Sequence, residues 1–286
     1  MTQNHSLKHR ARLEAKITGD KYTIVLEKIK ARMLEPTLKN LLSDSDYSLF
    51  SKYLDSRHGN GLTLFSGRSG TGRTTLLGVA IKYQDESRPN ERAVVLDNGE
   101  LGEWPYSPAL LLEEFEDTIA QDQEYSNIIY FKESLSVTQK EWISKALRMR
   151  PHRLIIGEVR EASAFTELAL TSMRGHEAMT TVHSSTSLTD LVHYIGQENR
   201  VFEAFEVIQH KKIHVENIGN VYMYAVVSLS TEALALVRAG DDNGLEALLA
   251  SRGIKTMKAK IEDLVSRGIL SIPAGPSSEV DYFTAS

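Results

Sequence analysis

The centre of this chain reads Leu62-Thr63-Leu64-Phe65-Ser66-Gly67-Arg68-Ser69-Gly70-Thr71-Gly72-Arg73-Thr74-Thr75. The first four residues predict a buried strand, and residues 74–83 predict a helix. Glycines between the two allow the backbone to turn so that several N–H groups point inward, where they can bind phosphate oxygens. The following helix adds the positive end of its dipole. The stretch therefore predicts a phosphate-binding loop between a strand and a helix.

Two positions of this loop carry specific predictions. Thr74 stands where a hydroxyl would coordinate Mg²⁺ beside the β- and γ-phosphates. Arg73 replaces the usual lysine, and its longer, planar guanidinium is less able to act as a compact point charge. We expect the backbone cradle to survive this change and hydrolysis to be slow, because transition-state stabilisation needs charge placed within about an ångström. The residues predicted to bind the nucleotide are Gly67, Ser69, Gly70, Thr71, Gly72, Arg73, Thr74 and Thr75.

Short apolar strands alternate with helices after the loop. The pattern predicts strands at residues 93–96, 128–131, 154–156 and 178–182, with helices at 138–149, 162–173 and 188–195. Such alternation implies an α/β fold whose mainly parallel sheet is covered on both faces. Residues 213–215 and 221–227 then predict a hairpin.

Helical segments are predicted on both sides of this region. We expect a helical N-terminal segment at residues 1–58, the α/β domain at 59–230 and a helical C-terminal segment at 231–286. Three C-terminal helices are predicted to end at Gly240, Gly253 and Gly268, because glycine takes the left-handed cap conformation without strain. The prolines and serines after Ile272 predict a loose tail.

Composition narrows the function classes. The 286 residues include no cysteine, which removes disulfide frameworks, cysteine zinc sites and thiol nucleophiles. A net charge of -5 gives no support for a broad nucleic-acid-binding surface, so no direct nucleic-acid partner is expected. No secretory signal and no apolar run near the roughly 18 residues of a spanning helix are visible. A cytoplasmic protein is expected, with any membrane association made through partners.

Charge is unevenly distributed along the chain. The first 32 residues carry eight Lys and Arg against three acids, whereas residues 110–126 carry six acids and no Lys or Arg. Solvated surface would explain both stretches. Alternatively, the basic arm docks on a partner subunit, an acidic surface or anionic lipid.

A second long signature lies at residues 147–161, LRMRPHRLIIGEVRE. A carboxylate at the end of such an apolar strand can orient a water beside a bound nucleotide, or take its proton. With SMRGHEAMTTVHSSTS at residues 172–187, it resembles the Walker B and histidine-box signatures of the PilT/GspE superfamily of secretion and pilus-motor ATPases. The two runs look most similar to the DotB and conjugative TraJ branch, and the resemblance covers residues 61–195.

The resemblance implies a RecA-like ATPase domain that uses ATP with Mg²⁺. It also implies a homo-oligomer, a hexameric ring, that works with inner-membrane platform or secretion-apparatus proteins. Carried over by position, Glu158 matches the Walker B glutamate and Arg160 the arginine two residues later. His176 and His183 match the two histidines of the histidine box.

Two regions depart from the family pattern. Its acidic box falls on residues 95–101 here, where Asp97 stands in for the first carboxylate, Asn98 cannot act as a base, and Glu100 offers an alternative alignment. The N-terminal segment is also shorter than the family's separate domain of about a hundred residues that supplies arginine fingers. Arg10, Arg12 and Arg32 are the candidates for that role.

Two functions remain open on these observations. The first is an active motor subunit, favoured by the presence of Thr74, Glu158, Arg160, His176 and His183. The second is a nucleotide-binding structural or regulatory subunit that hydrolyses poorly, in mixed rings with an active paralogue. Arg73, Asn98 and the short N-terminal segment favour it. An unrelated P-loop kinase or GTPase would leave the histidine-box run without explanation.

Overall fold

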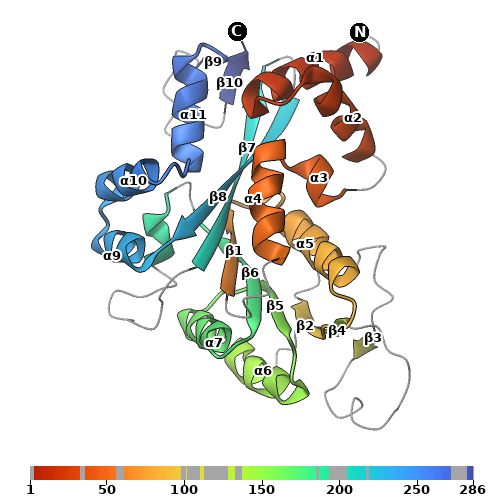
Figure 1. Cartoon of the computed structure of the whole chain (residues 1–286), viewed down its shortest axis with the longest axis vertical. Helices are drawn as coiled ribbons and strands as arrows, with labels where there is room; N and C mark the ends of the chain where they lie inside the picture. Colours follow the sequence, from red (N-terminus) through yellow and green to blue (C-terminus); the bar gives the residue numbers. More distant parts are fainter. Residues whose placement is uncertain are drawn as a thin grey trace.

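One mainly parallel sheet runs through the protein (Figure 1). The computed structural model describes residues 3–32, 36–55, 61–97, 101, 110–112, 128–132, 137–184, 187–192, 205–216, 219–271 and 282–285. Seven parallel strands take the order β3-β4-β2-β5-β6-β1-β7. They are β1 (Gly61–Gly67), β2 (Ala93–Asp97), β3 (Leu110–Leu112), β4 (Ile128–Lys132), β5 (Arg153–Glu158), β6 (Glu177–His183) and β7 (Phe205–Val215). The predicted α/β fold is confirmed.

Helices cover both faces of this sheet because strand side chains alternate between them. Leu64 packs in the apolar cluster of α6 (Gln139–Ala146) and α7 (Ala162–Met173), whereas its neighbour Phe65 packs with α5 (Arg73–Ser87). A 3₁₀ turn, η2 (Leu147–Met149), continues α6 toward β5. The buried strand and the helix predicted on either side of the glycine loop are therefore both present.

In the described part of the first 60 residues, four helices precede the sheet: α1 (Gln3–Thr18), α2 (Tyr22–Arg32), α3 (Leu38–Leu41) and α4 (Asp44–Asp55). The first two pack on each other, with Ala11 against Val25 and Ile29 in one small cluster. In contrast, α3 and α4 bury Leu38 and Phe50 in the same cluster as α5. The second half of the N-terminal segment thus shares its apolar core with the sheet.

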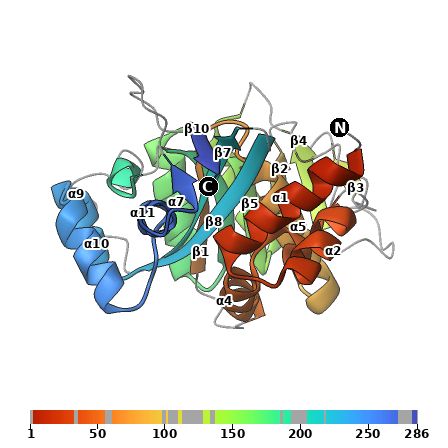
Figure 2. The same cartoon turned by 90° about the horizontal axis from the view of Figure 1, so that it is seen from above.

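A long hairpin crosses the molecule (Figure 2). It joins β7 to β8 (Gly219–Leu229) by an antiparallel ladder that runs from the pair of residues 205 and 229 to the pair of residues 215 and 219. The hairpin is longer than predicted. Polar residues at 209–212 interrupt the apolar pattern of β7, although Gln209 and His210 are buried.

The C-terminal part contains α9 (Thr231–Ala239), α10 (Asp242–Ser251) and α11 (Met257–Ser266), as predicted. Left-handed glycines follow all three, with φ of 68° at Gly240, 72° at Gly253 and 66° at Gly268. The predicted helix at 188–195 is represented by the 3₁₀ turn η3 (Thr189–Leu191), and residues 193–195 lie outside the described part.

The prediction of a loose tail is wrong for its last residues. Strand β10 (Tyr282–Ala285) pairs in parallel with β7 at residues 214 and 215, and antiparallel with β9 (Leu270–Ser271). Because β8 occupies one edge of β7 along its whole length, β10 lies on the same edge as β1, beyond its end. Backbone groups of β7 left unpaired there explain why a segment rich in local breakers still ends in a strand.

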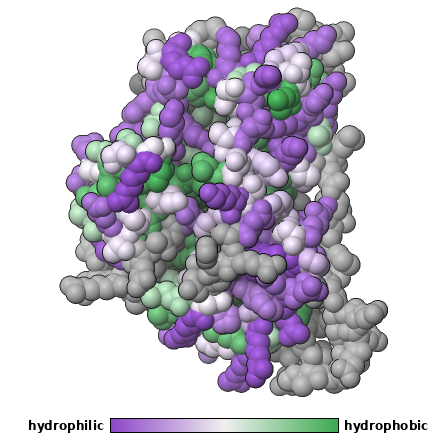
Figure 3. Space-filling model, viewed as in Figure 1, coloured by the Kyte–Doolittle hydropathy of each residue, from purple (hydrophilic) through white to green (hydrophobic). Residues whose placement is uncertain are grey.

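Hydrophilic residues cover most of the face seen in Figure 3, with apolar atoms showing between them. Across the described ranges, no helix is both long enough and apolar enough to span a bilayer.

Candidate functional site

The glycine loop leaves the sheet at the carboxyl end of β1 and enters α5 at Arg73. Gly70 and Gly72 have φ of 73° and 90°, a region that favours glycine. Gly67 is required for space: a Cβ there would lie 2.6 Å from the main-chain oxygen of His210 and 2.9 Å from Oγ1 of Thr71. Each predicted glycine therefore has a steric reason in the structure.

Side chains close and border this loop. Oγ1 of Thr71, which is buried, donates to the main-chain oxygen of Arg68 at 2.8 Å. Thr74 is half-buried in the first turn of α5, while Ser69 and Thr75 are exposed. The described loop thus offers backbone N–H groups and hydroxyls at the start of a helix, the surroundings that bind anions.

Strand register brings the second signature to the same edge of the sheet. Gly67 is paired with His183 across β1 and β6, and Glu158 with Thr181 across β5 and β6. The register shifts between residues 156 and 158, which makes an irregularity just before the carboxylate. Since the carboxyl ends of parallel strands share one edge of the sheet, the loop, Glu158 and His183 lie together at that edge.

Glu158, His183 and Arg73 contact one another at this edge of the sheet. Oε1 of Glu158 lies 2.7 Å from Nε2 of His183 and 3.9 Å from Nη2 of Arg73. Nη2 of Arg73 lies 3.0 Å from Nε2 of His183. A ring nitrogen that donates to a carboxylate cannot also accept from a guanidinium, so these two hydrogen bonds of Nε2 are alternatives. The Arg73 side chain is only 8% exposed and is directed at Glu158 and His183.

The Glu158 carboxylate is held from its other side. Nε of Arg160 donates to Oε2 of Glu158 at 3.0 Å. Gln139, at the start of α6, donates to the main-chain oxygen of Glu158 at 2.7 Å and accepts from the main-chain N–H of Arg160 at 3.3 Å. Sequence reasoning missed Gln139, because its contact depends on how α6 packs against the end of β5.

The acidic box is represented by Asp97 alone among the described residues. Asp97 ends β2, next to the end of β5 in the sheet, and is 3% exposed. Its Oδ1 accepts from the main-chain N–H of Leu101 at 2.8 Å. Residues 98–100 are outside the described ranges, so the alternative that uses Glu100 stays a prediction.

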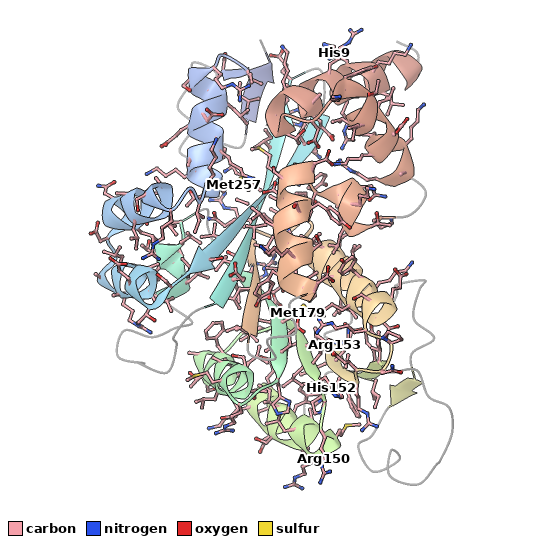
Figure 4. All side chains as sticks on the ribbon, in the orientation of Figure 1. His9, Arg150, His152, Arg153, Met179 and Met257 are labelled. Carbon is pink, nitrogen blue, oxygen red and sulfur yellow. The ribbon has the colours of Figure 1, made fainter. Side chains whose placement is uncertain are left out.

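His176 is not brought to the loop within one chain. It precedes β6, and its Nδ1 lies 2.7 Å from the main-chain oxygen of Pro151. The seven residues of β6, from Glu177 to His183, span about 20 Å of extended strand. His176 is therefore at the opposite edge, where Figure 4 shows His152 and Arg153 at the start of β5.

A buried histidine that the sequence did not single out lies beneath the loop. His210 is 3% exposed, and its ring centroid lies 5.1 Å from that of Tyr224 and 6.0 Å from that of Phe65. Burial, and then the positive charge of Arg73, lowers the pKa of His210 to about 3. The ring is accordingly neutral near pH 7.

Two of the three candidate arginine fingers are bound to a buried glutamate of the same chain. Nε of Arg10 and Nη1 of Arg32 lie 2.8 Å and 2.9 Å from the two carboxylate oxygens of Glu14, which is buried. Arg12 is exposed on α1. Within one chain, Arg10 and Arg32 thus form ion pairs inside the N-terminal helices.

A cavity of about 190 Å³ lies among the N-terminal helices, β8 and α11. Tyr222 and Tyr224 line it. Atoms of both tyrosines lie 3.9 Å from the position a Cβ would take at Gly72, so the cavity adjoins the loop. Over the described part of the chain, no group of three or more His, Asp and Glu side chains is arranged to hold a metal ion.

Comparison with known proteins identifies the family. The model of the family described as "Type II/IV secretion system protein" matches residues 16–213. The chain is 27% identical over 151 residues to the conjugal transfer protein TrbB of Rhizobium radiobacter. The aligned region covers 53% of this chain and 40% of TrbB. The chain is 30% identical over 159 residues to the type IV secretion system protein VirB11 of Bartonella quintana, covering 54% and 38%. The chain thus spans about two fifths of the length of these curated relatives.

Two solved structures share the fold. The ATPase DotB of Legionella pneumophila matches with a TM-score of 0.52 at 14% identity, over 81% of this chain and 66% of that one. The pilus retraction motor PilT with bound ADP matches with a TM-score of 0.56 at 17% identity, over 85% and 68%. The match of the family model to more than half of the chain, together with the predicted loop and strand-end signatures, shows that this chain belongs to the type II/IV secretion system protein family.

Proposed function

We propose that this chain binds ATP with Mg²⁺ at the glycine loop and hydrolyses it, as a motor subunit that powers pilus function, secretion or conjugative transfer. One observation carries the proposal: a glutamate and a histidine, Glu158 and His183, meet 2.7 Å apart where the loop leaves the sheet. The family match supports the same reading. So do the relatives, since DotB is described as an ATPase and PilT as a motor with bound ADP.

In this proposal the loop holds the phosphates. Backbone N–H groups at residues 67–75 bind the phosphate oxygens, helped by the positive end of α5. The close approach of Gly67 to His210 and Thr71 leaves no room for a side chain, as a phosphate cradle requires. Ser69 and Thr75 add hydroxyls at the exposed rim.

Oxygen donors near the loop suit Mg²⁺, which prefers hydroxyl, carboxylate and water ligands. The Thr74 hydroxyl would hold the ion bound with the nucleotide, and Asp97 and Glu158 would face it from the ends of β2 and β5. In the alternative alignment of the acidic box, Glu100 takes the place of Asp97. Magnesium would neutralise charge on the phosphates when bound.

Glu158 is the proposed base, which orients a water or takes its proton. His183 shares the proton or positions the carboxylate through their contact, and Arg160 holds the other oxygen of Glu158 at 3.0 Å. A part for His176 in the reaction needs a neighbouring subunit, because within one chain it bonds to Pro151 at the far edge.

The proposed assembly is a hexameric ring in the cytoplasm, docked on inner-membrane platform or secretion-apparatus proteins. We propose three units along the chain: a helical N-terminal segment at residues 1–58, a RecA-like domain at 59–230, and a helical C-terminal segment at 231–286. Movement of the first against the second would transmit the work of hydrolysis. Such coupling requires two states that differ in affinity for ATP and its product.

A specific observation favours the second candidate function, a nucleotide-binding structural or regulatory subunit. Arg73, which replaces the usual lysine, is turned toward Glu158 and His183. A guanidinium 3.9 Å from the base occupies space beside its carboxylate and competes with a water for that position. Slow turnover is expected on this account, and mixed rings with an active paralogue would then supply the motor.

Steady-state ATP turnover separates the two candidates. It should be measured on wild-type protein, Arg73→Lys and Glu158→Gln, with oligomer size recorded in parallel. The motor proposal expects slow turnover in the wild type, an increase with Arg73→Lys and loss with Glu158→Gln. Tight ATP binding with no turnover in either wild type or Arg73→Lys would favour the structural subunit.

A further inference from the structure

The glycine loop needs a positive charge that Arg73 is not placed to supply. Phosphates bound at such loops are contacted by a lysine ammonium, which acts as a compact point charge. Here the guanidinium at that position lies 3.0 Å from Nε2 of His183 and 3.9 Å from Oε1 of Glu158. It is nearly buried in these contacts, which draw it toward the end of β5.

Another lysine lies beside the loop. Nζ of Lys212 is 3.7 Å from the position that a Cβ would take at Gly70. Lys212 comes from β7, two residues after His210, whose main-chain oxygen approaches Gly67. Because side chains alternate along a strand, Lys212 shares the face of His210, and β7 pairs directly with β1.

The surroundings of Lys212 suit a ligand of negative charge. Its partner across the hairpin is Tyr222, whose ring lies close to Gly72, so the lysine stem and the tyrosine flank the same turn. Lys212 is half-buried, and among the described residues no hydrogen bond or ion pair engages its ammonium group. A partly desolvated ammonium beside inward-facing N–H groups attracts phosphate more strongly than one in water.

We propose that Lys212 supplies the phosphate-binding ammonium of this site in place of the loop lysine, with Nζ contacting a phosphate of the bound nucleotide. The inference rests on the proposed nucleotide binding and assigns one more residue to it. It also explains how a loop that carries Arg73 can hold a polyphosphate while the arginine contacts the glutamate and the histidine.

Neighbouring Lys211 provides a matched control. It is also half-buried on β7, but it is paired with Met223 and lies on the opposite face of the hairpin. Because the Lys211 side chain lies on the other face, removing its charge tests the loss of a positive charge on β7 without altering the face that carries Lys212. Methionine keeps the length of either stem and removes only the ammonium.

Calorimetry with Mg-ATP and Mg-ADP tests the proposal on the wild-type chain, Lys212→Met, Lys212→Arg, Lys211→Met and Arg73→Met. Thermal unfolding of each variant reports whether it is folded. Loss of one charge-assisted contact should weaken nucleotide binding in Lys212→Met about tenfold to a hundredfold. Lys212→Arg should recover most of the affinity, Lys211→Met should stay within about twofold, and Arg73→Met should lose less than Lys212→Met.

The outcomes distinguish failure of the proposed nucleotide binding from failure of the role proposed for Lys212. If the wild-type chain binds neither nucleotide, the proposed function itself fails. If the wild type binds and Lys212→Met binds equally well, only the role of Lys212 is overturned. A loss of affinity that arginine does not restore would assign Lys212 to the shape of the loop, which also contradicts a phosphate contact.

Discussion

Nε2 of His183 lies 2.7 Å from Oε1 of Glu158, although the two residues are 25 positions apart in the chain. They meet because β5 and β6 are adjacent, parallel strands that both end at the edge where the loop leaves β1. The irregularity before Glu158 shifts the register at the point where the carboxylate turns to the histidine. The contact is therefore a product of sheet order and register.

Removing the histidine should lower the rate of hydrolysis more than the affinity for ATP. In His183→Gln the proton-sharing partner of Glu158 is lost, and a positioned acid or base group contributes about 10²-fold or more. We expect kcat to fall by about that factor with KM changed less than threefold. His214→Gln is the control, since His214 is exposed on β7 and bonds to Asn220. An unchanged kcat in His183→Gln would remove the histidine from the reaction.

A methyl group at Gly67 should abolish the cradle. The added Cβ of Gly67→Ala would lie 2.6 Å from the main-chain oxygen of His210, which cannot move away without shifting β7. We expect a loss of about 1–3 kcal/mol in the free energy of unfolding, with loss of ATP binding. In the control Gly253→Ala nothing lies within 4 Å of the new Cβ, and φ is 72°. Gly253→Ala should lower the free energy of unfolding by about 1–2 kcal/mol and leave ATP binding intact.

Much of this site was predictable from the sequence because its parts lie at strand ends. The loop follows an apolar strand directly, and Glu158 ends another, so a parallel sheet brings both to one edge. The same logic separates the two histidines. His176 precedes β6 and His183 ends it, and the ends of one strand face opposite edges.

Other contacts could not be predicted, because they depend on long-range register. Lys212 and His210 lie beside the loop because β7 pairs with β1 in one specific register. The polar residues at 209–212 also prevent β7 from being predicted as one strand, because they break the apolar alternation that is typical of strands. The pairing of β10 with residues 214 and 215 joins segments almost seventy residues apart, and no local pattern encodes it.

An ion pair between distant segments should contribute to stability. Nζ of Lys260 on α11 lies 2.7 Å and 2.9 Å from the carboxylate oxygens of Asp46 on α4, and it donates to the main-chain oxygen of Tyr224 at 2.8 Å. Because Lys260 is 23% exposed, solvent screens part of this interaction, and Ser43 still donates to Asp46 in its absence. Lys260→Met should lower the free energy of unfolding by about 1–3 kcal/mol.

Urea denaturation measures this difference. Lys258→Met is the matched control, because Lys258 is exposed on the same helix and should change stability by no more than about 0.5 kcal/mol. A double-mutant cycle with Asp46→Asn isolates the pair, and a coupling free energy near zero would show that the contact contributes nothing.

The neutral, buried His210 should make stability fall on the acid side of neutrality. The pKa of His210 is lowered from 6.5 to about 3 by burial, so between these values the unfolded chain binds a proton that the folded chain does not. Stability is then fully present above about pH 6.5 and is lost as the pH falls toward 3, at about 1.4 kcal/mol per pH unit. Between pH 7.5 and 5 the wild type should lose about 2 kcal/mol more than His210→Phe, which cannot bind the proton.

Urea titrations of wild type and His210→Phe at half-unit pH intervals give the slope of unfolding free energy against pH for each protein. Titratable groups that both proteins share cancel in the difference between the two slopes. Parallel curves for wild type and His210→Phe would mean that His210 gains its proton in the folded chain as easily as in the unfolded one. The ring would then carry a positive charge directly beneath the loop, beside Arg73.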